Sequence, residues 1–144
     1  MLWGLKTVAI FDVWSLEHLL SGISIGALAY QLNRRVFKGQ MGIEEQDVNT
    51  GYFDIIMVLF LAYAWEVLEH YLEIGLFGSK VEYWFQGVEY WANRMISDPL
   101  MTVIGYYIAR AYAYLVNPAR IVSLLWLFVH FFLFPHSMYL HELL

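Results

Sequence analysis

The 144-residue sequence contains no cysteine. Disulfide bonds, thiolate nucleophiles, iron–sulfur clusters and cysteine-based zinc sites are therefore excluded. Basic residues are also scarce, because 8 Lys and Arg stand against 13 Asp and Glu and leave a formal charge of −5. A nucleic-acid partner requires a basic surface that can meet its phosphates. We therefore expect no nucleic acid among the partners.

Hydrophobic residues make up 60% of the chain, and the mean hydropathy is +0.54. Soluble proteins contain about 45–50% apolar residues. The excess lies in long apolar runs with Trp and Tyr near their ends, a pattern that matches a hydrocarbon layer of about 30 Å and its interfaces. The sequence predicts an all-α, polytopic integral membrane bundle that forms a single domain, with membrane lipids around it.

Three to four transmembrane helices are expected, in segments 8–30, 52–72, 98–116 and 119–134. The first segment carries Asp12 and no clean cleavage site follows it, so we expect it to remain in the mature protein. Asp98 and Pro99 would cap the third segment. Asn117 and Pro118 would form a tight turn. The fourth segment is short for a full span, and a proline follows it at position 135.

Residues 81–96 have the periodicity of an amphipathic helix lying in the membrane interface. Its apolar stripe contains Trp84, Phe85, Val88 and Trp91, and its polar stripe contains Glu82, Gln86, Glu89 and Asn93.

Lysine and arginine positions suggest an orientation for the bundle, because cytoplasmic loops carry an excess of these residues. The expected cytoplasmic set is Arg34, Arg35, Lys38, Arg110 and Arg120, and the expected outer set is Lys6, Lys80 and Arg94. Both termini would then lie outside, in a protein of the bacterial inner membrane.

With this topology, most ionisable residues of the spans fall at one level near the outer face. They are Asp12, His18, Glu66, Glu69, His70, Glu73, Asp98, His130 and His136. A helical rotation of about 100° per residue brings the four residues of the second segment to one face. Ionisable groups at membrane depth indicate a functional site. The alternative is a buried hydrogen-bond network, with Asp12, Glu73 and Asp98 as solvated or capping carboxylates and His130 as a packing residue.

The same rotation places Asp12, Ser15, His18, Gly22 and Gly26 on one face of the first segment. Gly22 and Gly26 form a GxxxG motif, which allows a second helix to approach closely. The polar face of this segment is thus also expected to be its packing face.

Oxygen and imidazole ligands without sulfur suit Zn, Mn or Fe. The candidate metal ligands are Asp12, His18, Glu66, Glu69 and His70. Glu66, His70 and Asp98 are the candidate catalytic residues, and Ser15 and Arg94 are the candidates for binding a ligand, with Arg94 holding a phosphate. The HExxH zinc motif and the di-iron Glu-x-x-His repeat are both missing.

Three blocks of this sequence resemble an uncharacterised bacterial family of short inner-membrane proteins. They are Asp12-Val-Trp-Ser-Leu-Glu-His18, Trp65-Glu-Val-Leu-Glu69, and the block from Asn93 through Asp98 to Gly105. The chain has His70 where that family has Asn, and one extra residue between Asn93 and Asp98. The last block is also similar to the closing motif of VanZ-like proteins, which usually have Asn at the position of Thr102. The resemblance implies a shared polar site and a link to the cell envelope.

Three functions compete on this basis. The first is a metal-assisted hydrolase or transferase that acts on a lipid head group at the outer leaflet. The second is an accessory subunit of a larger membrane complex, or a homo-oligomer, in which the polar cluster only joins the helices. The third, ion translocation, would require polar groups across the inner half of the membrane, where residues 55–65 are apolar.

Overall fold

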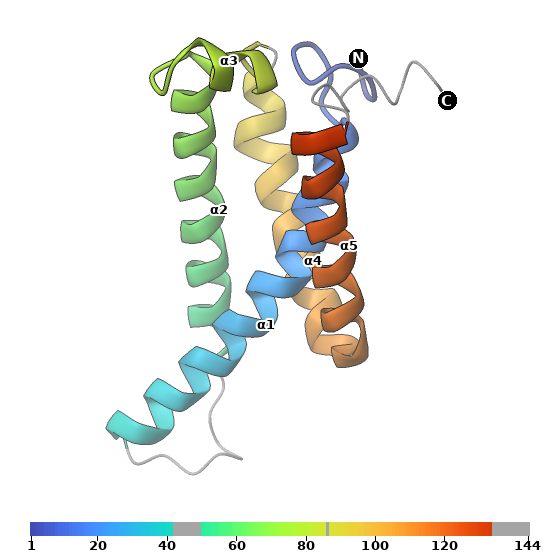
Figure 1. Cartoon of the computed structure of the whole chain (residues 1–144). Helices are drawn as coiled ribbons and strands as arrows, with labels where there is room; N and C mark the ends of the chain where they lie inside the picture. Colours follow the sequence, from blue (N-terminus) through green and yellow to red (C-terminus); the bar gives the residue numbers. More distant parts are fainter. Residues whose placement is uncertain (42–49, 86, 134–144) are drawn as a thin grey trace.

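The computed structural model describes residues 1–41, 50–85 and 87–133 of the chain. Its described part is all-helical and contains no strand, in agreement with the predicted fold class. The order is α1 (Val13–Met41), α2 (Gly51–Glu73), α3 (Ser79–Phe85), η1 (Asn93–Ser97), α4 (Asp98–Ala111), η2 (Ala113–Leu115), α5 (Val116–Phe128) and η3 (Val129–Leu133). The long helices run alternately up and down, and α3 lies across the end where residues 1–12 also fold (Figure 1).

The first predicted segment begins too early. Residues 1–12 form a compact loop, in which the N–H of Gly4 donates to the carbonyl of Phe11 at 3.2 Å. Helix α1 starts at Val13, where the carboxylate of Asp12 accepts the N–H of Ser15 at 3.0 Å and caps the first turn. Asp12 therefore acts at a helix end, and α1 extends well past the predicted limit at residue 30.

The continuous interfacial helix predicted for residues 81–96 is not found. Helix α3 covers only Ser79–Phe85, and η1 begins at Asn93. Between them Gly87 has φ +98°, which a right-handed helix cannot accommodate. Residue 86 lies outside the described residues. The sequence of residues 81–96 does have helical periodicity, but Gly87 interrupts the helix.

The boundary between the third and fourth predicted segments also differs. Helix α4 ends at Ala111, and the chain turns at Tyr112, whose φ and ψ are −134° and 67°. Asn117 and Pro118 lie in the first turn of α5. Proline is tolerated there because N–H groups of a first turn have no partner within the helix. The prolines at 99 and 118 thus both begin helices, and the one at 135 lies outside the described residues.

The prediction of a close helix contact at the GxxxG motif is confirmed. A Cβ atom on Gly22 would lie 2.4 Å from the carbonyl oxygen of Thr102, and one on Gly26 would lie 2.5 Å from Cα of Tyr106. On the opposite side, a Cβ on Gly105 would lie 2.5 Å from the carbonyl oxygen of Leu19. Helices α1 and α4 therefore touch backbone to backbone, and this contact fixes the side chains that both helices carry toward the N-terminal end.

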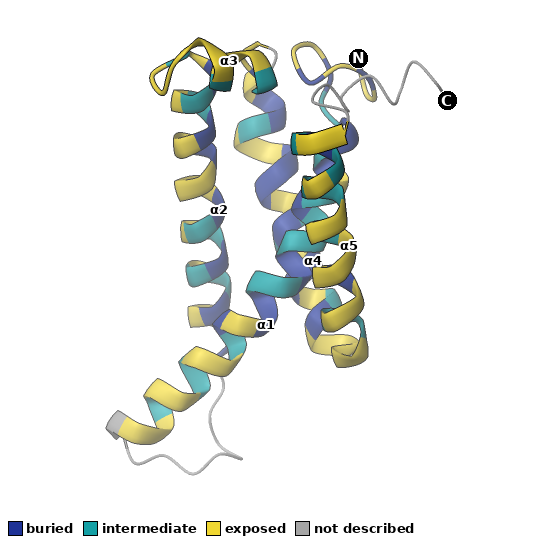
Figure 2. Ribbon diagram, in the orientation of Figure 1, coloured by how far each residue is buried: buried dark blue, intermediate teal, exposed yellow. Residues whose placement is uncertain are grey.

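The outward faces of α2 and α5 are exposed (Figure 2). Many of the exposed residues there have large apolar side chains. Phe60 on α2 is 70% exposed and Leu124 on α5 is 67% exposed. Among the described residues, two helical stretches are long and apolar enough to cross a membrane, Gly51–Glu73 and Ala113–Leu133.

Candidate functional site

Buried polar side chains gather at the end of the bundle where the N-terminal loop, the end of α2 and the start of α4 meet. Six carboxyl groups lie there together with two cations, Lys6 and Arg94. The carboxyl groups belong to Asp12, Glu66, Glu69, Glu73, Glu89 and Asp98. The carboxyl groups thus outnumber the cations, and the excess must be offset by bound protons or by bound cations.

The outer layer of this cluster is a closed network around Glu73. Lys6 donates to one carboxylate oxygen of Glu73 at 2.5 Å. Arg94 and the backbone N–H of Glu89 donate to the other oxygen. Glu73 therefore joins the N-terminal loop, α2 and the approach to η1. Its oxygens are satisfied, so this layer is structural.

The inner layer centres on His18 of α1. Its Nε2 atom lies 3.5 Å from Oε1 of Glu66 on α2 and 3.3 Å from Oδ2 of Asp98 on α4. Ser15 donates to the other oxygen of Asp98 at 2.9 Å. Three helices thus each contribute one side chain to the same point, as expected for the candidates on α1 and α2.

Two sets of three residues in this layer could hold a metal ion, because one ligand atom from each member lies within 4.8 Å of the others. The first set is His18, Glu66 and Glu69, and the second is Glu66, Glu89 and Asp98. All five residues are buried. Three protein ligands with a fourth position open is the arrangement of catalytic zinc sites.

Several buried atoms of the inner layer have no hydrogen-bond partner. Both carboxylate oxygens of Glu66 are in this state, although the residue is only 1% exposed. The Oδ2 atom of Asp98 and the Oε2 atom of Glu89 are also buried without a hydrogen-bond partner. A buried carboxylate without donors is costly. These atoms point to a ligand that supplies the missing contacts.

A further buried carboxylate, Asp54, lies at the opposite end of the bundle and provides a comparison. It accepts hydrogen bonds from Asn33 at 2.8 Å, Thr50 at 2.9 Å and Tyr106 at 3.0 Å, and Arg110 lies 3.6 Å away. This group ties α1, α2 and α4 together with its oxygens satisfied. The role of Asp54 could not be predicted from the sequence, because a lone Asp in a helix's first turn resembles an ordinary capping residue.

Glu89 lies outside the long helices, near η1. Burial raises the pKa of its carboxyl group to about 10, and the negative charge of Asp98 adds to the effect. Glu89 is therefore protonated at neutral pH when no metal is bound, so part of the excess negative charge is offset by a proton.

Arg94 is placed in the site by η1, a π-helical turn. Its Nε atom is buried without a hydrogen-bond partner and lies 3.7 Å from Oε2 of Glu66. Such a turn contains one residue more than a turn of α-helix.

The structure brings some predicted site residues together and places others apart. His18, Glu66, Glu69 and Asp98 converge, with Ser15 and Arg94 beside them. Asp12 and His70 belong to neither metal-ligand set. The Nδ1 atom of His70 lies 3.2 Å from NH1 of Arg94 and accepts its hydrogen bond, since arginine can only donate.

Sequence reasoning also missed three members of the cluster. The sequence pattern assigns Lys6 to the topology and Glu89 to the polar stripe of a helix. Asn93 falls in that stripe and in the third resembling block, but it is not among the candidate site residues. Asn93 is fully buried, and Ser15 Oγ lies 3.4 Å from its Oδ1 atom. Lys6 lies 67 positions from Glu73, and Asn93 lies 78 positions from Ser15. Glu89 lies outside the helix that carries Glu73, 16 positions away. The spacing within one helix therefore could not identify these three residues. His136 and His141 lie outside the described residues.

No protein-family model, curated protein or solved structure matches this chain.

Proposed function

We propose that the protein is a membrane-embedded hydrolase or transferase that acts on a lipid head group with a divalent metal ion held by His18, Glu66 and Glu69. The observation that carries this proposal is the state of Glu66. Both of its oxygens are buried without a donor, whereas Asp54, equally buried in the same bundle, has three. A structural carboxylate is satisfied by the protein. Glu66 is left for a ligand.

The proposed chemistry for a phospholipid is attack on its phosphodiester. The oxygen of water, or of an acceptor alcohol in a transferase, bonds to phosphorus, and the bond from phosphorus to the head-group oxygen breaks. Asp98, whose Oδ2 has no hydrogen-bond partner, takes the proton from the attacking group and returns it to the leaving oxygen. Arg94 donates its Nε–H to a phosphate oxygen. A bound metal ion would polarise the phosphoryl group and activate the nucleophile.

The proposal includes a membrane topology in which α1, α2, α4 and the α5–η3 unit cross the bilayer. Two of these, α2 and the α5–η3 unit, belong to the stretches that are long and apolar enough to cross a membrane. The charges support the orientation. Arg34 and Arg110 both lie against the ring of Tyr30, and Arg110 lies 3.6 Å from Asp54 at the start of α2. Lys6 and Arg94 both contact Glu73 at the other end of α2. The site would then lie near the outer face.

This topology predicts that alkaline phosphatase fused after Arg35 is inactive, and that the same reporter fused after Leu144 is active, because the enzyme works only outside the cytoplasm. Reporter activity per amount of fusion protein in bacterial cells is the measurement. Equal activity at both positions would rule out four spans and leave three, with the last helix in the interface.

The function is tested by metal content and head-group release. Protein purified in mild detergent should contain about one Zn, Mn or Fe per chain by elemental analysis. The protein should release head groups from vesicles of phosphatidylglycerol and phosphatidylethanolamine, lose this activity on chelation and regain it when the metal is restored. A protein that carries no metal and takes up none on addition would refute the proposal. The outer network around Glu73 would then favour an accessory subunit.

A further inference from the structure

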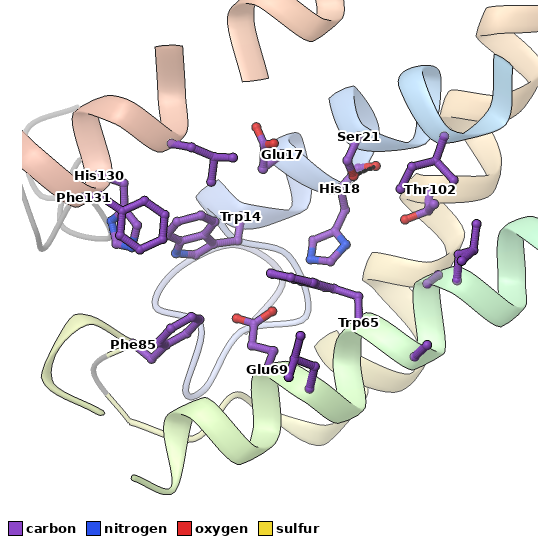
Figure 3. Close-up of a pocket in the computed structure, with 16 residues that line it drawn as sticks. Trp14, Glu17, His18, Ser21, Trp65, Glu69, Phe85, Thr102, His130 and Phe131 are labelled. Carbon is purple, nitrogen blue, oxygen red and sulfur yellow. Dashed lines mark hydrogen bonds between the residues drawn. The ribbon is translucent and has the colours of Figure 1, made fainter. Parts of the chain in front are cut away.

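A cavity of about 510 Å³ lies beside the candidate metal site, between α1, α2 and α5 (Figure 3). Its lining is predominantly apolar. The main apolar side chains are Trp14, Ile25, Leu61, Trp65, Leu68 and Leu127. This volume is in the range of ligand-binding sites, and such sites are usually apolar with a few polar groups that fix orientation.

Two polar side chains of the cavity belong to the candidate metal site. His18 and Glu69 project into it from facing helices, beside the indole ring of Trp65 (Figure 3). The polar side chains of Glu17, Ser21, Thr102 and His130 also line the cavity. Glu17, Ser21 and Thr102 each make a hydrogen bond within the protein, although the Oε2 atom of Glu17 has no partner. The cavity thus has an apolar body and a polar end, and that end contains two residues of the first metal-ligand set.

The cavity reaches the outer surface of the bundle along α2. Trp65 and Leu68 line it, and they are also 46% and 42% exposed. The helical stretches on its two sides, Gly51–Glu73 and Ala113–Leu133, are the two among the described residues that are long and apolar enough to cross a membrane. A molecule could therefore enter sideways from the lipid, without passing through water.

We propose that this cavity binds one acyl chain of a membrane phospholipid, so that the head-group end of the lipid lies at His18 and Glu69. An amphiphile matches the cavity because its hydrocarbon contacts the apolar walls and its polar end meets His18 and Glu69, two residues of the first metal-ligand set. The inference rests on the proposed function for the reaction at that end, and it specifies the substrate as a lipid that is held by its chain. Binding of the chain itself requires no metal.

The test uses the full-length protein in lipid nanodiscs that contain a small fraction of phosphatidylglycerol with a diazirine on one acyl chain. After photolysis, labelled positions are mapped by mass spectrometry. Leu61 and Leu127, which are partly buried and line the cavity, should be labelled as strongly as Leu124, which faces outward. The ratio of cavity labelling to Leu124 labelling serves as the internal measure, since it cancels differences in lipid content.

Ala64 lines the cavity but is exposed, so it lies at the cavity mouth. Ala64→Trp should reduce this ratio by about tenfold or more, because a large side chain at the mouth obstructs the path of the acyl chain; tenfold corresponds to a loss of about 1.4 kcal/mol. The matched control is Ile56→Trp, on the same helix at a position 60% exposed and outside the cavity, which should leave the ratio unchanged. Metal content should be normal in both variants, since neither residue is a candidate ligand.

The inference is overturned if Leu61 and Leu127 are labelled only at background in the wild type, or if Ala64→Trp lowers the ratio no more than Ile56→Trp does. These outcomes are independent of metal. If the protein has no metal but is labelled in the cavity, the proposed function is refuted and the acyl-chain site stands. If the protein contains metal but is not labelled in the cavity, the acyl-chain site is refuted and the proposed function stands.

Discussion

Replacing Glu66 with glutamine is expected to abolish metal binding while leaving the fold intact. Glu66 belongs to both candidate metal-ligand sets, so its loss removes a ligand from each. Loss of a supporting partner outside the ligand sphere lowers metal affinity by about 10–100-fold, and loss of a ligand should exceed this. The metal-free variant should be as stable as the wild type or more stable, because a buried carboxylate without donors has been replaced by a neutral group. Elemental analysis and thermal unfolding in detergent measure both effects.

Asp54→Asn is the matched control for this experiment. It makes the same chemical change to a buried carboxylate, but one that accepts three hydrogen bonds. We expect a loss of about 1–3 kcal/mol in stability, because an amide nitrogen cannot accept the bonds that the carboxylate oxygen accepted. Its metal content should stay normal. If Glu66→Gln retains the metal, or if it destabilises the protein as Asp54→Asn does, Glu66 is part of a structural network and the metal hypothesis fails.

The second large effect is expected at Gly22. In Gly22→Ala the new methyl group would meet the backbone of Thr102, with the carbonyl oxygen at 2.4 Å and Cα at 2.7 Å. Backbone cannot rotate away, so α1 and α4 must separate, at a cost of about 1–3 kcal/mol for overpacking. Since His18 and Asp98 face each other across the same contact at 3.3 Å, metal affinity should fall as well.

Gly39→Ala provides the control, because it makes the same substitution in the same helix. Nothing lies within 4 Å of the Cβ position there. This variant should be stabilised by about 0.5–1 kcal/mol, the ordinary advantage of alanine over glycine in a helix. Opposite signs for the two variants, read as melting temperatures in detergent, would establish the close contact of α1 with α4. A neutral Gly22→Ala would contradict it.

The helices that could be predicted from the sequence are those whose signal is contained in a single segment. The range predicted for the second span, 52–72, agrees with α2 within one residue at each end, because an uninterrupted apolar run precedes a polar end. The start of α4 at Asp98 is correct for a similar reason, since Pro99 is tolerated only in a helix's first turn. The prediction of a continuous helix at 81–96 was wrong, because hydrophobic periodicity does not show that a single glycine, Gly87, has a positive φ.

The candidate site divides in the same way. Rotation along one helix placed Glu66 and Glu69 on one face of α2, and the glycine motif placed His18 on the packing face of α1, so their convergence could be anticipated. His70 shares the face of α2 but turns toward Arg94, because it lies one turn further along than Glu66 and meets η1. A helical wheel shows the direction in which a side chain points around the helix axis. It does not show which residue of another helix lies in that direction.

Sequence alone determined the helical class, the close contact at Gly22 and Gly26, and the concentration of carboxylates toward one end of the bundle. These follow from local rules, namely the period of the helix and the size of the side chains. Only the tertiary structure decided which carboxylates have partners. Glu73 and Asp54 are satisfied by residues far away in the chain, and Glu66 is not. A hydrogen bond depends on the distance between two atoms, and for residues on different helices that distance is set by how the helices pack.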